Sequence, residues 1–398
     1  MEKTEAHFGC FDDIGGAARA GVHRVTAGKV RTNPTVFRLK QQMSIEQLPE
    51  CALLFSEQDQ QIHSLNEISA ILAEQLLVGA TEGALLEELS NRGVEPGAVT
   101  EWVRTFLGEA SRLALLQADV QSPPVHAMQT LRIGSGLLSL RYASADLVDL
   151  VAPAFAHLEV DELEADHRLD IFGDGDLLFI GNDDERAFVT PRESLAVRLK
   201  SLIVEHALAT GDQLAALHAA CLERCGRVVL LLGSPGAGKT ILTLALLKQG
   251  FRYGSDDVSL VRRDGEVEGV AVPPGVKGSA WNGVERFADD VSNLPVHIRP
   301  DGQQVRFLAL SKEVLASPGA VRAVIRLRRS AEKSAELDRI SAEDGLAELF
   351  RESLSRDGRC SIEIVRALAA IVRGADCFEL RYSDAGEGAS LLYQQIPL

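Results

Sequence analysis

The sequence predicts an α/β protein of more than one domain, and three observations lead to this prediction. An apolar run at 227–232 leads into a glycine-rich loop and then into strong helix formers at 241–248, the strand–loop–helix order of an α/β sheet. Residues 35–118 contain short apolar runs as well as apolar residues at helical spacing, which is the content of a small α+β unit. The chain has 398 residues, enough for two or three domains.

The composition is that of a globular protein with an acidic balance. Hydrophobic residues make up 46% and charged residues 25%, and the formal net charge is −16. Because nucleic acid is gripped through its phosphates by a basic face, this charge argues against a nucleic-acid partner. No apolar run approaches the roughly 18 residues that cross a bilayer, and the first residues lack the order of a secretion signal. We therefore expect no membrane partner and a cytoplasmic location.

Changes in composition divide the chain. The first residues mix charges with a Gly-Gly pair and show no sustained period, which predicts a flexible lead-in. Pro123 and Pro124 mark a linker. The predicted segments are a lead-in at 1–34, a winged-helix unit at 35–118, a mixed α/β segment at 125–212 that packs on the core, and a glycine-loop domain at 213–398.

The winged-helix prediction follows from the order of elements in the second segment. Ala52–Phe55 is a short apolar run before a polar turn, and Gln61–Ser64 can return after the turn as the second strand of a hairpin. Asn66 and Thr81 stand where helix N-caps are wanted, and Pro96 suits the first residue of a third helix. Two or three strands with three helices are the content of a winged helix.

Residues 51–116 resemble the PqqD-like family, most specifically in the phrase IHSLNEISAILAEQL at 62–76. Members of that family include the elements that bind leader peptides of ribosomally made, modified peptides. The resemblance implies a precursor or leader-peptide partner that lies along a strand edge and extends the sheet. A structural or dimerising module is the open alternative. DNA binding is the weakest interpretation, since the helices at 82–92 and 97–115 carry three arginines against several glutamates.

The segment at 125–212 predicts strands at Leu131–Leu140 and Leu177–Ile180 and a helix over 192–216. Gly173–Asp176 reads as a turn between strands, and it lacks the later glutamate that a calcium loop needs. The six cysteines of the chain include no CxxC pair and no matching histidine cluster. We therefore expect reduced thiols and no zinc site.

Residues 233–240 read GSPGAGKT, a complete phosphate-binding loop between a predicted strand and a predicted helix. Its glycines let backbone N–H groups point at a β-phosphate, and the helix start adds a favourable dipole. Lys239 can reach the β- and γ-oxygens of ATP, and the Thr240 hydroxyl can ligate the Mg²⁺ that bridges them. The predicted cofactors are therefore ATP and Mg²⁺. The predicted nucleotide-binding residues are Gly233, Ser234, Pro235, Gly236, Ala237, Gly238, Lys239 and Thr240.

Asp256 and Asp257 follow in the phrase GFRYGSDDVSLV at 250–261, just before an apolar run. In a generic phosphate-loop ATPase the acidic metal ligand instead ends such a run, so this order narrows the family. A solvated turn before a strand is the plainer interpretation of the pair, and the loop upstream favours a site.

Together with His218, in LHAACLERCGRVVLLLG, these motifs resemble the HPr kinase/phosphorylase family over about 213–398. The resemblance implies a P-loop kinase domain with a mixed sheet. It implies that Asp256 is the general base for an acceptor hydroxyl and that Asp257 and Thr240 hold magnesium. His218 would lie beside the γ-phosphate region and support Asp256, while Lys239 neutralises charge. A packed strand histidine is the alternative for His218. The family tends to form rings, which implies a homo-oligomer.

The stretch at 271–281 departs from the second glycine-rich signature of the bifunctional members, so the resemblance does not extend to phosphorolysis or to HPr as substrate. Lys277 in this stretch is either a phosphate or acceptor contact or a solvated lysine. VRAVIRLRRS at 321–330 predicts a strand. Arg328 and Arg329 at its end are favoured as a surface pair over a nucleotide contact.

The two resemblances combine into one hypothesis, a peptide kinase. The N-terminal unit captures a leader peptide, and the C-terminal unit phosphorylates a Ser or Thr hydroxyl of the same precursor. Placing both sites on one chain raises the effective concentration of the acceptor. Two alternatives stay open: an ATP-binding regulator with little turnover, and a small-molecule kinase whose N-terminal unit only dimerises.

Overall fold

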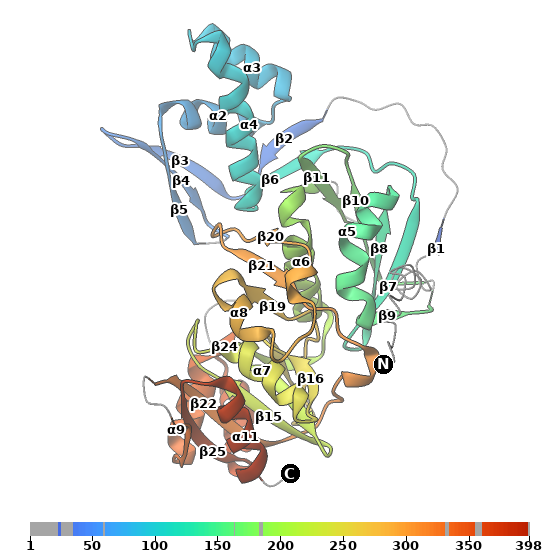
Figure 1. Ribbon diagram of the computed structural model, residues 1–398. Coiled ribbons are helices and arrows are strands. Elements are labelled where there is room, and N and C mark those ends of the chain that lie inside the picture. Colours follow the sequence, from blue (N-terminus) through green and yellow to red (C-terminus); the bar gives the residue numbers. More distant parts are fainter. Residues whose placement is uncertain are drawn as a thin grey trace, which may run out of the picture.

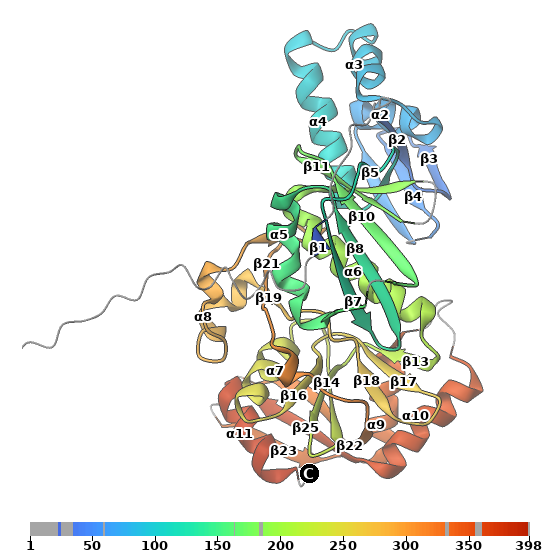
Figure 2. The ribbon, with the colours of Figure 1, turned by 90° about the vertical axis from the view of Figure 1, so that its right-hand side faces the viewer.

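The computed structural model describes residues 35–58, 60–162, 164–182, 186–330, 334–354 and 360–396, and the strand β1 (His23–Arg24) before them. Apart from β1, the predicted lead-in at 1–34 lies outside the described residues. The chain is mixed α/β, as predicted. It is elongated, and three parts follow one another from the N-terminal helices to the C-terminal sheet (Figure 1, Figure 2).

The first part joins a three-stranded antiparallel sheet to three helices. Asn66 Oδ1 accepts a hydrogen bond from the Ser69 N–H at 2.8 Å, and Thr81 Oγ1 accepts one from the Ala84 N–H at 3.2 Å. Pro96 is the first residue of the third helix, so the predicted helix starts are confirmed. The strands, in sheet order, are β3 (Met43–Gln47), β4 (Ala52–Ser56) and β5 (Gln61–Leu65), and the helices are α2 (Glu67–Val78), α3 (Glu82–Asn91) and α4 (Pro96–Arg112).

A nine-stranded sheet connects the first part to the second. Its order is β1-β7-β8-β10-β11-β12-β6-β2, with β9 paired to β7. The sheet crosses the predicted linker, because β2 and β6 come from 35–118 and most other strands come from 125–212. Phe37 of β2 and Val189 of β12 lie in one core with Leu72 of α2. The strands are β2 (Val36–Leu39), β6 (Leu116–Asp119), β7 (Ala127–Ile133), β8 (Gly136–Tyr142), β9 (Glu159–Val160), β10 (His167–Phe172), β11 (Leu177–Gly181) and β12 (Ala187–Pro191).

The helices of the second part pack between this sheet and the C-terminal part. Leu195 and Leu199 share a core with Val258 and Val272 of the third part, so the two parts are joined by apolar contact. The helices are α5 (Ala145–Phe155) and α6 (Leu195–Thr210), with 3-10 turns η1 (Ala156–Leu158) and η2 (Arg192–Ser194).

Two predicted elements of the second part are wrong. Leu131–Leu140, predicted as one strand, is the hairpin of β7 and β8, because Gly134 takes a φ of 58° and turns the chain. The helix predicted over 192–216 ends at Thr210, because 213–217 instead pairs with a strand of the third part.

The third part is built on a six-stranded sheet in the order β16-β14-β15-β22-β25-β23, in which β15, β22 and β25 are parallel. The other sheets are β18-β17-β13-β24 and β19-β21-β20. The strands are β13 (Gln213–Leu217), β14 (Ala220–Arg224), β15 (Arg227–Leu232), β16 (Arg252–Ser255), β17 (Ser259–Arg262), β18 (Val267–Gly269), β19 (Gly275–Lys277), β20 (His297–Ile298), β21 (Gln304–Phe307), β22 (Ala320–Arg329), β23 (Glu336–Arg339), β24 (Ser353–Leu354) and β25 (Asp376–Tyr382).

Helices cover both faces of the six-stranded sheet. Val229 and Leu231 of β15 share a core with α7 and α11, whereas Val228 and Leu230 share one with α9 and α10. The apolar run at 227–232 is therefore a strand buried on both faces, as predicted. The helices are α7 (Lys239–Lys248), α8 (Trp281–Val284), α9 (Ala342–Arg351), α10 (Ile362–Gly374) and α11 (Ala385–Gln395), with 3-10 turns η3 (Gly278–Ala280), η4 (Val291–Asn293) and η5 (Lys312–Val314).

Candidate active site

The glycine-rich loop joins the end of β15 to the start of α7. Its last residue, Gly238, has φ of 92° and ψ of 20°, in the left-handed region. A Cβ at this position would meet Tyr382 Oη at 2.6 Å and Arg329 Nη2 at 2.9 Å, so a side chain would be excluded by space as well as by the backbone. The first N–H groups of α7 have no partners within the helix, and they make the loop a candidate anion site.

Lys239, the first residue of α7, is buried beneath the loop. Its Nζ donates a hydrogen bond to the carbonyl oxygen of Gly233 at 2.6 Å, so the side chain spans the loop from its last turn to its first residue. Burial lowers the pKa of Lys239, and the negative charges of Glu352, Asp257 and Asp256 oppose that shift. A cation held in this place is suited to meet an anion in the loop.

Asp256 is buried against the same end of α7. The Thr240 hydroxyl donates a hydrogen bond to Asp256 Oδ2 at 2.9 Å. The Tyr253 hydroxyl lies 3.1 Å from Oδ1 and 2.7 Å from the carbonyl oxygen of Val272, so one proton serves two acceptors. Lys200 Nζ lies 3.6 Å from Oδ1, and it reaches the carboxylate from α6 of the second part.

The Thr240 hydroxyl and the Asp256 carboxylate fit a magnesium ion that is shared with phosphates. Mg²⁺ prefers oxygen ligands, and it is commonly held by one or two protein oxygens together with water and phosphate oxygens. Within the described residues, no group of three or more His, Cys, Asp or Glu side chains could hold a metal ion. A cation at this site would therefore need further oxygen ligands from outside the chain.

His218 lies between two carboxylates on the other side of the acidic pair. Its Nε2 is 3.0 Å from Asp257 Oδ1, and its Nδ1 is 3.1 Å from Glu352 Oε2. The hydrogen bond to Asp257 raises the pKa of His218 against the effects of burial and of the Lys239 charge. The same bond lowers the pKa of Asp257 to about 2. The Asp257 side chain is 51% exposed, so its carboxylate faces the solvent side of the site.

The predicted site residues therefore come together, and the direct contact of His218 is with Asp257. The resemblance implied that His218 supports Asp256, with Asp257 as the magnesium ligand. The structure instead places Asp257 against His218 and Asp256 against Thr240. Consecutive residues of this turn point to opposite sides, which no motif in the sequence reveals.

Sequence analysis missed three residues of this cluster. Lys200 comes from α6, which the sequence marks only as an amphipathic helix. Glu352 is 134 residues from its partner His218, a separation that no local pattern bridges. Tyr253 lies within the phrase GFRYGSDD, so its place beside the acidic pair was the one accessible signal.

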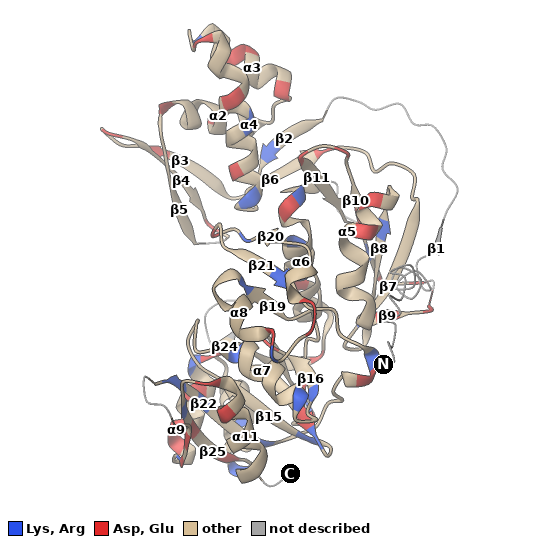
Figure 3. Cartoon of the chain, viewed as in Figure 1, with Lys and Arg blue, Asp and Glu red and all other residues tan. Residues whose placement is uncertain are grey.

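The charges of the site are local. Lys277, at the end of β19, is among the positive charges that lower the pKa of Lys239. Elsewhere, basic and acidic residues are interspersed along the helices and strands of all three parts (Figure 3). Lys200 and Lys239 act on the two aspartates, and Lys277 acts on Lys239, so positive charges gather at this site in an otherwise acidic chain.

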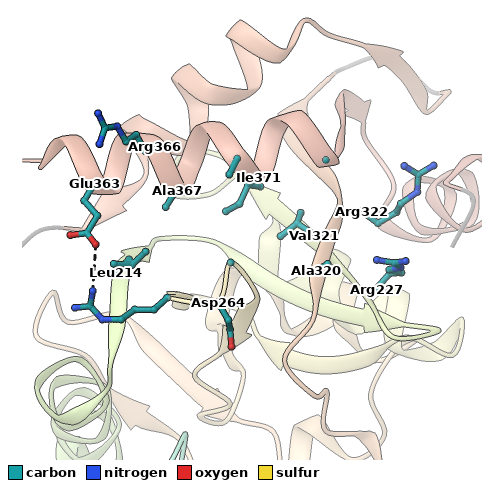
Figure 4. Close-up of a pocket in the computed structure, with 14 residues that line it drawn as sticks. Leu214, Arg227, Asp264, Ala320, Val321, Arg322, Glu363, Arg366, Ala367 and Ile371 are labelled. Carbon is teal, nitrogen blue, oxygen red and sulfur yellow. Dashed lines mark hydrogen bonds and ion pairs between the residues drawn. The ribbon is translucent and has the colours of Figure 1, made fainter.

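A cavity of about 790 Å³ lies elsewhere, at the edge where β15 and β22 begin. Its lining includes Arg227, Val321 and Ile371 (Figure 4), and two further lining residues, Glu363 and Arg263, form an ion pair. Parallel strands β15 and β22 carry the loop at their opposite, carboxyl ends, so this cavity is separate from the candidate site. Its volume alone does not make it a site of chemistry, because no member of the loop or acidic cluster lines it.

Comparisons with known proteins give little beyond this geometry. No family model matches the chain, and no curated protein matches it. A solved structure of the HPr(Ser) kinase/phosphatase from Coxiella burnetii is similar over 42% of this chain and 84% of its own, with 12% identity and a TM-score of 0.19. A TM-score this low supports no transfer of function to this chain. Among the described residues, no helix is both long and apolar enough to cross a membrane.

Proposed function

We propose that this chain is an ATP-dependent kinase that phosphorylates a Ser or Thr hydroxyl of a ribosomally made precursor peptide. The observation that carries the proposal is the 2.9 Å hydrogen bond from Thr240 to Asp256 at the start of α7, directly behind the GSPGAGKT loop. A hydroxyl, a carboxylate and the buried Lys239 at one loop are the parts that hold a magnesium-bound nucleotide. A glycine turn without function would need none of them.

The phosphate end of the nucleotide would lie on the loop. Lys239 would exchange its bond to the Gly233 carbonyl for phosphate oxygens, and Thr240 with Asp256 would hold the metal ion. When bound, Mg-ATP supplies the transferable phosphoryl group and a metal ion that neutralises its charge. Lys200, 3.6 Å from Asp256, would balance the negative charge on the side where β16 ends.

Asp257 would position the acceptor hydroxyl and take its proton. Its carboxylate is half exposed, and His218 holds it by a 3.0 Å contact while Glu352 holds the other ring nitrogen of His218. This assignment reverses the two roles that the resemblance implied for Asp256 and Asp257, because Asp256 is already engaged by Thr240. An ionised carboxylate beside a weak nucleophile gives it direction and a proton acceptor.

The β5 edge would capture the leader of the peptide. Among the described strands β5 pairs only with β4, so one side of its backbone is open to a further strand. Ile62 on β5 is 65% exposed, and it offers an apolar contact for a side chain of the added strand. Capture at this edge would raise the concentration of the acceptor near the loop even if the kinase site itself binds weakly.

The test is phosphoryl transfer measured by mass spectrometry on the full chain. The protein is incubated with Mg-ATP and with the precursor peptide encoded beside its gene, in wild-type form and as Asp257→Asn. We expect a peptide heavier by one or more phosphates from the wild type and none from the variant. Binding of ATP without any phosphopeptide would contradict the peptide-kinase proposal and favour a regulator or a small-molecule kinase.

A matched pair of isoleucines separates capture from chemistry. Ile62→Asp places a charge on the β5 edge, whereas Ile362→Asp places one at the start of α10, where Ile362 is 73% exposed. We expect Ile62→Asp alone to weaken binding of the leader peptide in a fluorescence-anisotropy titration. Equal binding by both variants would remove the β5 edge from the proposal and leave the kinase chemistry standing.

A further inference from the structure

Three parallel strands end side by side at the edge that carries the loop. Leu232, the last residue of β15, pairs in register with Arg326 of β22, so β22 continues past it along the loop. Arg329, the last residue of β22, pairs with Tyr382, the last residue of β25. In open α/β sheets, ligands lie outside the carboxyl ends of such strands. The side chains of Arg329 and Tyr382 therefore stand where a ligand on the loop would extend.

Arg329 differs from the other arginines of its strand. Arg326 and Arg328 both pair with the carboxylate of Glu379, at 2.7 Å and 3.3 Å. Within the described part of the chain, Arg329 has no carboxylate partner; its Nη1 donates to the carbonyl oxygen of Ser383 at 2.6 Å. Its guanidinium carbon lies 4.8 Å from the centre of the Tyr382 ring. An aromatic ring thus lies against an exposed cation that has no carboxylate partner among the described residues.

The same two side chains lie against the loop. Tyr382 Oη donates a hydrogen bond to the carbonyl oxygen of Ala237 at 2.7 Å, and Tyr382 is fully buried. Arg329 Nη2 and Tyr382 Oη are the atoms that a side chain at Gly238 would meet first. The buried Tyr382 therefore contacts both the loop and the exposed side chain of Arg329.

The charges on the two flanks of the loop decide which way a nucleotide would point. On the flank of β14 and β16 lie Asp256, Asp257 and His218, which the proposed reaction needs for the metal ion and the acceptor. On the flank of β22 and β25 lie Arg329 and Tyr382. The nucleoside of a nucleotide whose phosphates lie on the loop must extend toward one of the two flanks. The proposed reaction already uses the acidic flank for the metal ion and the acceptor.

We propose that Arg329 and Tyr382 form the nucleoside subsite, with the purine base stacked on the open face of the Arg329 guanidinium. This inference rests on the proposed nucleotide-binding function and adds the orientation of the nucleotide. A planar guanidinium stacks on aromatic rings and on bases alike, so it can lie between Tyr382 on one face and a base on the other. Arg329 would then be a binding residue, where the sequence favoured a plain surface pair with Arg328.

The test compares two ligands by calorimetry on the full chain in Mg²⁺ buffer: a non-hydrolysable ATP analogue and inorganic tripolyphosphate, which has no nucleoside. The variants are Arg329→Ala, Arg329→Lys and the matched control Arg328→Ala, from the same exposed strand end. Loss of a stacked cation should weaken binding of the ATP analogue by about fivefold to thirtyfold. We expect Arg329→Ala and Arg329→Lys to show this loss, tripolyphosphate to bind all proteins alike, and Arg328→Ala to match the wild type.

Each alternative result of the calorimetry would contradict a particular part of the proposal. If Arg329→Ala weakens tripolyphosphate as much as the ATP analogue, Arg329 acts on phosphates or on the loop, and the nucleoside subsite is wrong. If Arg329→Lys binds like the wild type, charge and not stacking is the contact. If Arg329→Ala equals Arg328→Ala, the subsite is wrong while nucleotide binding stands. If the wild type binds neither ligand, the proposed function fails and takes the subsite with it.

Discussion

The Nε2 atom of His218 lies 3.0 Å from Oδ1 of Asp257. This contact distinguishes the surroundings of two adjacent carboxylates. Asp257 is half exposed and contacts His218, while Asp256 is buried beside the Thr240 hydroxyl. Under the proposed function, Asp256 belongs to a metal side and Asp257 to an acceptor side, and each assignment can be tested independently.

Substitution of Asp256 should impair nucleotide binding, whereas substitution of Asp257 should impair phosphoryl transfer. Asp256→Asn removes a negative ligand from the metal side, so we expect Mg²⁺-dependent nucleotide binding to weaken by about tenfold or more. Asp257→Asn removes the proton acceptor, so we expect nucleotide binding to persist while kcat falls about 10²- to 10⁴-fold. Calorimetry with the ATP analogue and single-turnover transfer assays measure the two effects.

Asp289→Asn is the control for both variants, because its side chain is 90% exposed and only meets Lys248 on the surface. It should leave binding and transfer unchanged. The opposite pattern, with Asp257→Asn abolishing metal-dependent binding, would restore the role that the family resemblance implied for Asp257.

The pKa of His218 should respond to its two carboxylates unequally. The bond to Asp257 is the largest cause of the raised pKa, and Glu352 adds a smaller Coulombic effect. We expect Asp257→Asn to lower the pKa of His218 more than Glu352→Gln does, as followed by the ring-proton NMR titration. His206, whose pKa is lowered by burial, is the internal reference and should not move. An unchanged His218 titration in Asp257→Asn would contradict the contact.

The sign of the pH effect follows from these shifts. The pKa of His218 is raised from 6.5 on folding, so protonated His218 stabilises the fold below that pH and the contribution is lost as pH rises through the folded value. The pKa of Asp257 is lowered from 3.8 to about 2, so its contribution is present above pH 3.8 and lost as pH falls toward 2. In denaturant melts, the free energies of unfolding of the wild type and Asp257→Asn should therefore differ most between pH 3.8 and pH 6.5.

Lys200 should matter although it lies outside the glycine-loop domain. Its Nζ is 3.6 Å from Asp256, and its side chain is only 15% exposed. We expect Lys200→Gln to lower kcat/KM by about tenfold or more, because a positive charge beside the phosphates would be lost. Lys248 pairs with Asp289 at the same 3.6 Å on the surface, so Lys248→Gln is the matched control and should keep full activity. Equal activity of both variants would mean that Lys200 is only a structural contact.

Tyr253 should contribute to stability as well as to the site. Its buried hydroxyl bonds the carbonyl oxygen of Val272 and Asp256 Oδ1, so Tyr253→Phe leaves two buried acceptors without this proton. We expect the free energy of unfolding to fall by about 1–2 kcal/mol in urea melts. Tyr393→Phe alters a tyrosine that is 40% exposed, so it should change the free energy of unfolding little. If Tyr253→Phe lowers the free energy of unfolding no more than Tyr393→Phe does, water replaces the hydrogen bonds of the Tyr253 hydroxyl.

The sequence by itself determined the local features of this protein. The buried strand β15, the loop with its glycines, the helix α7 and the capped starts at Asn66 and Thr81 follow from apolar spacing and from residues that satisfy helix ends. Each of these depends on neighbours within a few positions. The same local rule failed at Gly134, where a single turn residue converted one predicted strand into a hairpin.

Only the tertiary structure decided which side chains meet. Glu352 reaches His218 across 134 residues, and Lys200 arrives from a helix of another part. Arg329 bonds the Ser383 carbonyl whereas Arg328 pairs with Glu379, because their side chains leave the strand in different directions. The nine-stranded sheet likewise crosses the boundary that composition marked at Pro123 and Pro124. The physical reason is that spacing along the chain fixes backbone geometry, whereas contact between distant elements depends on how their buried faces pack together.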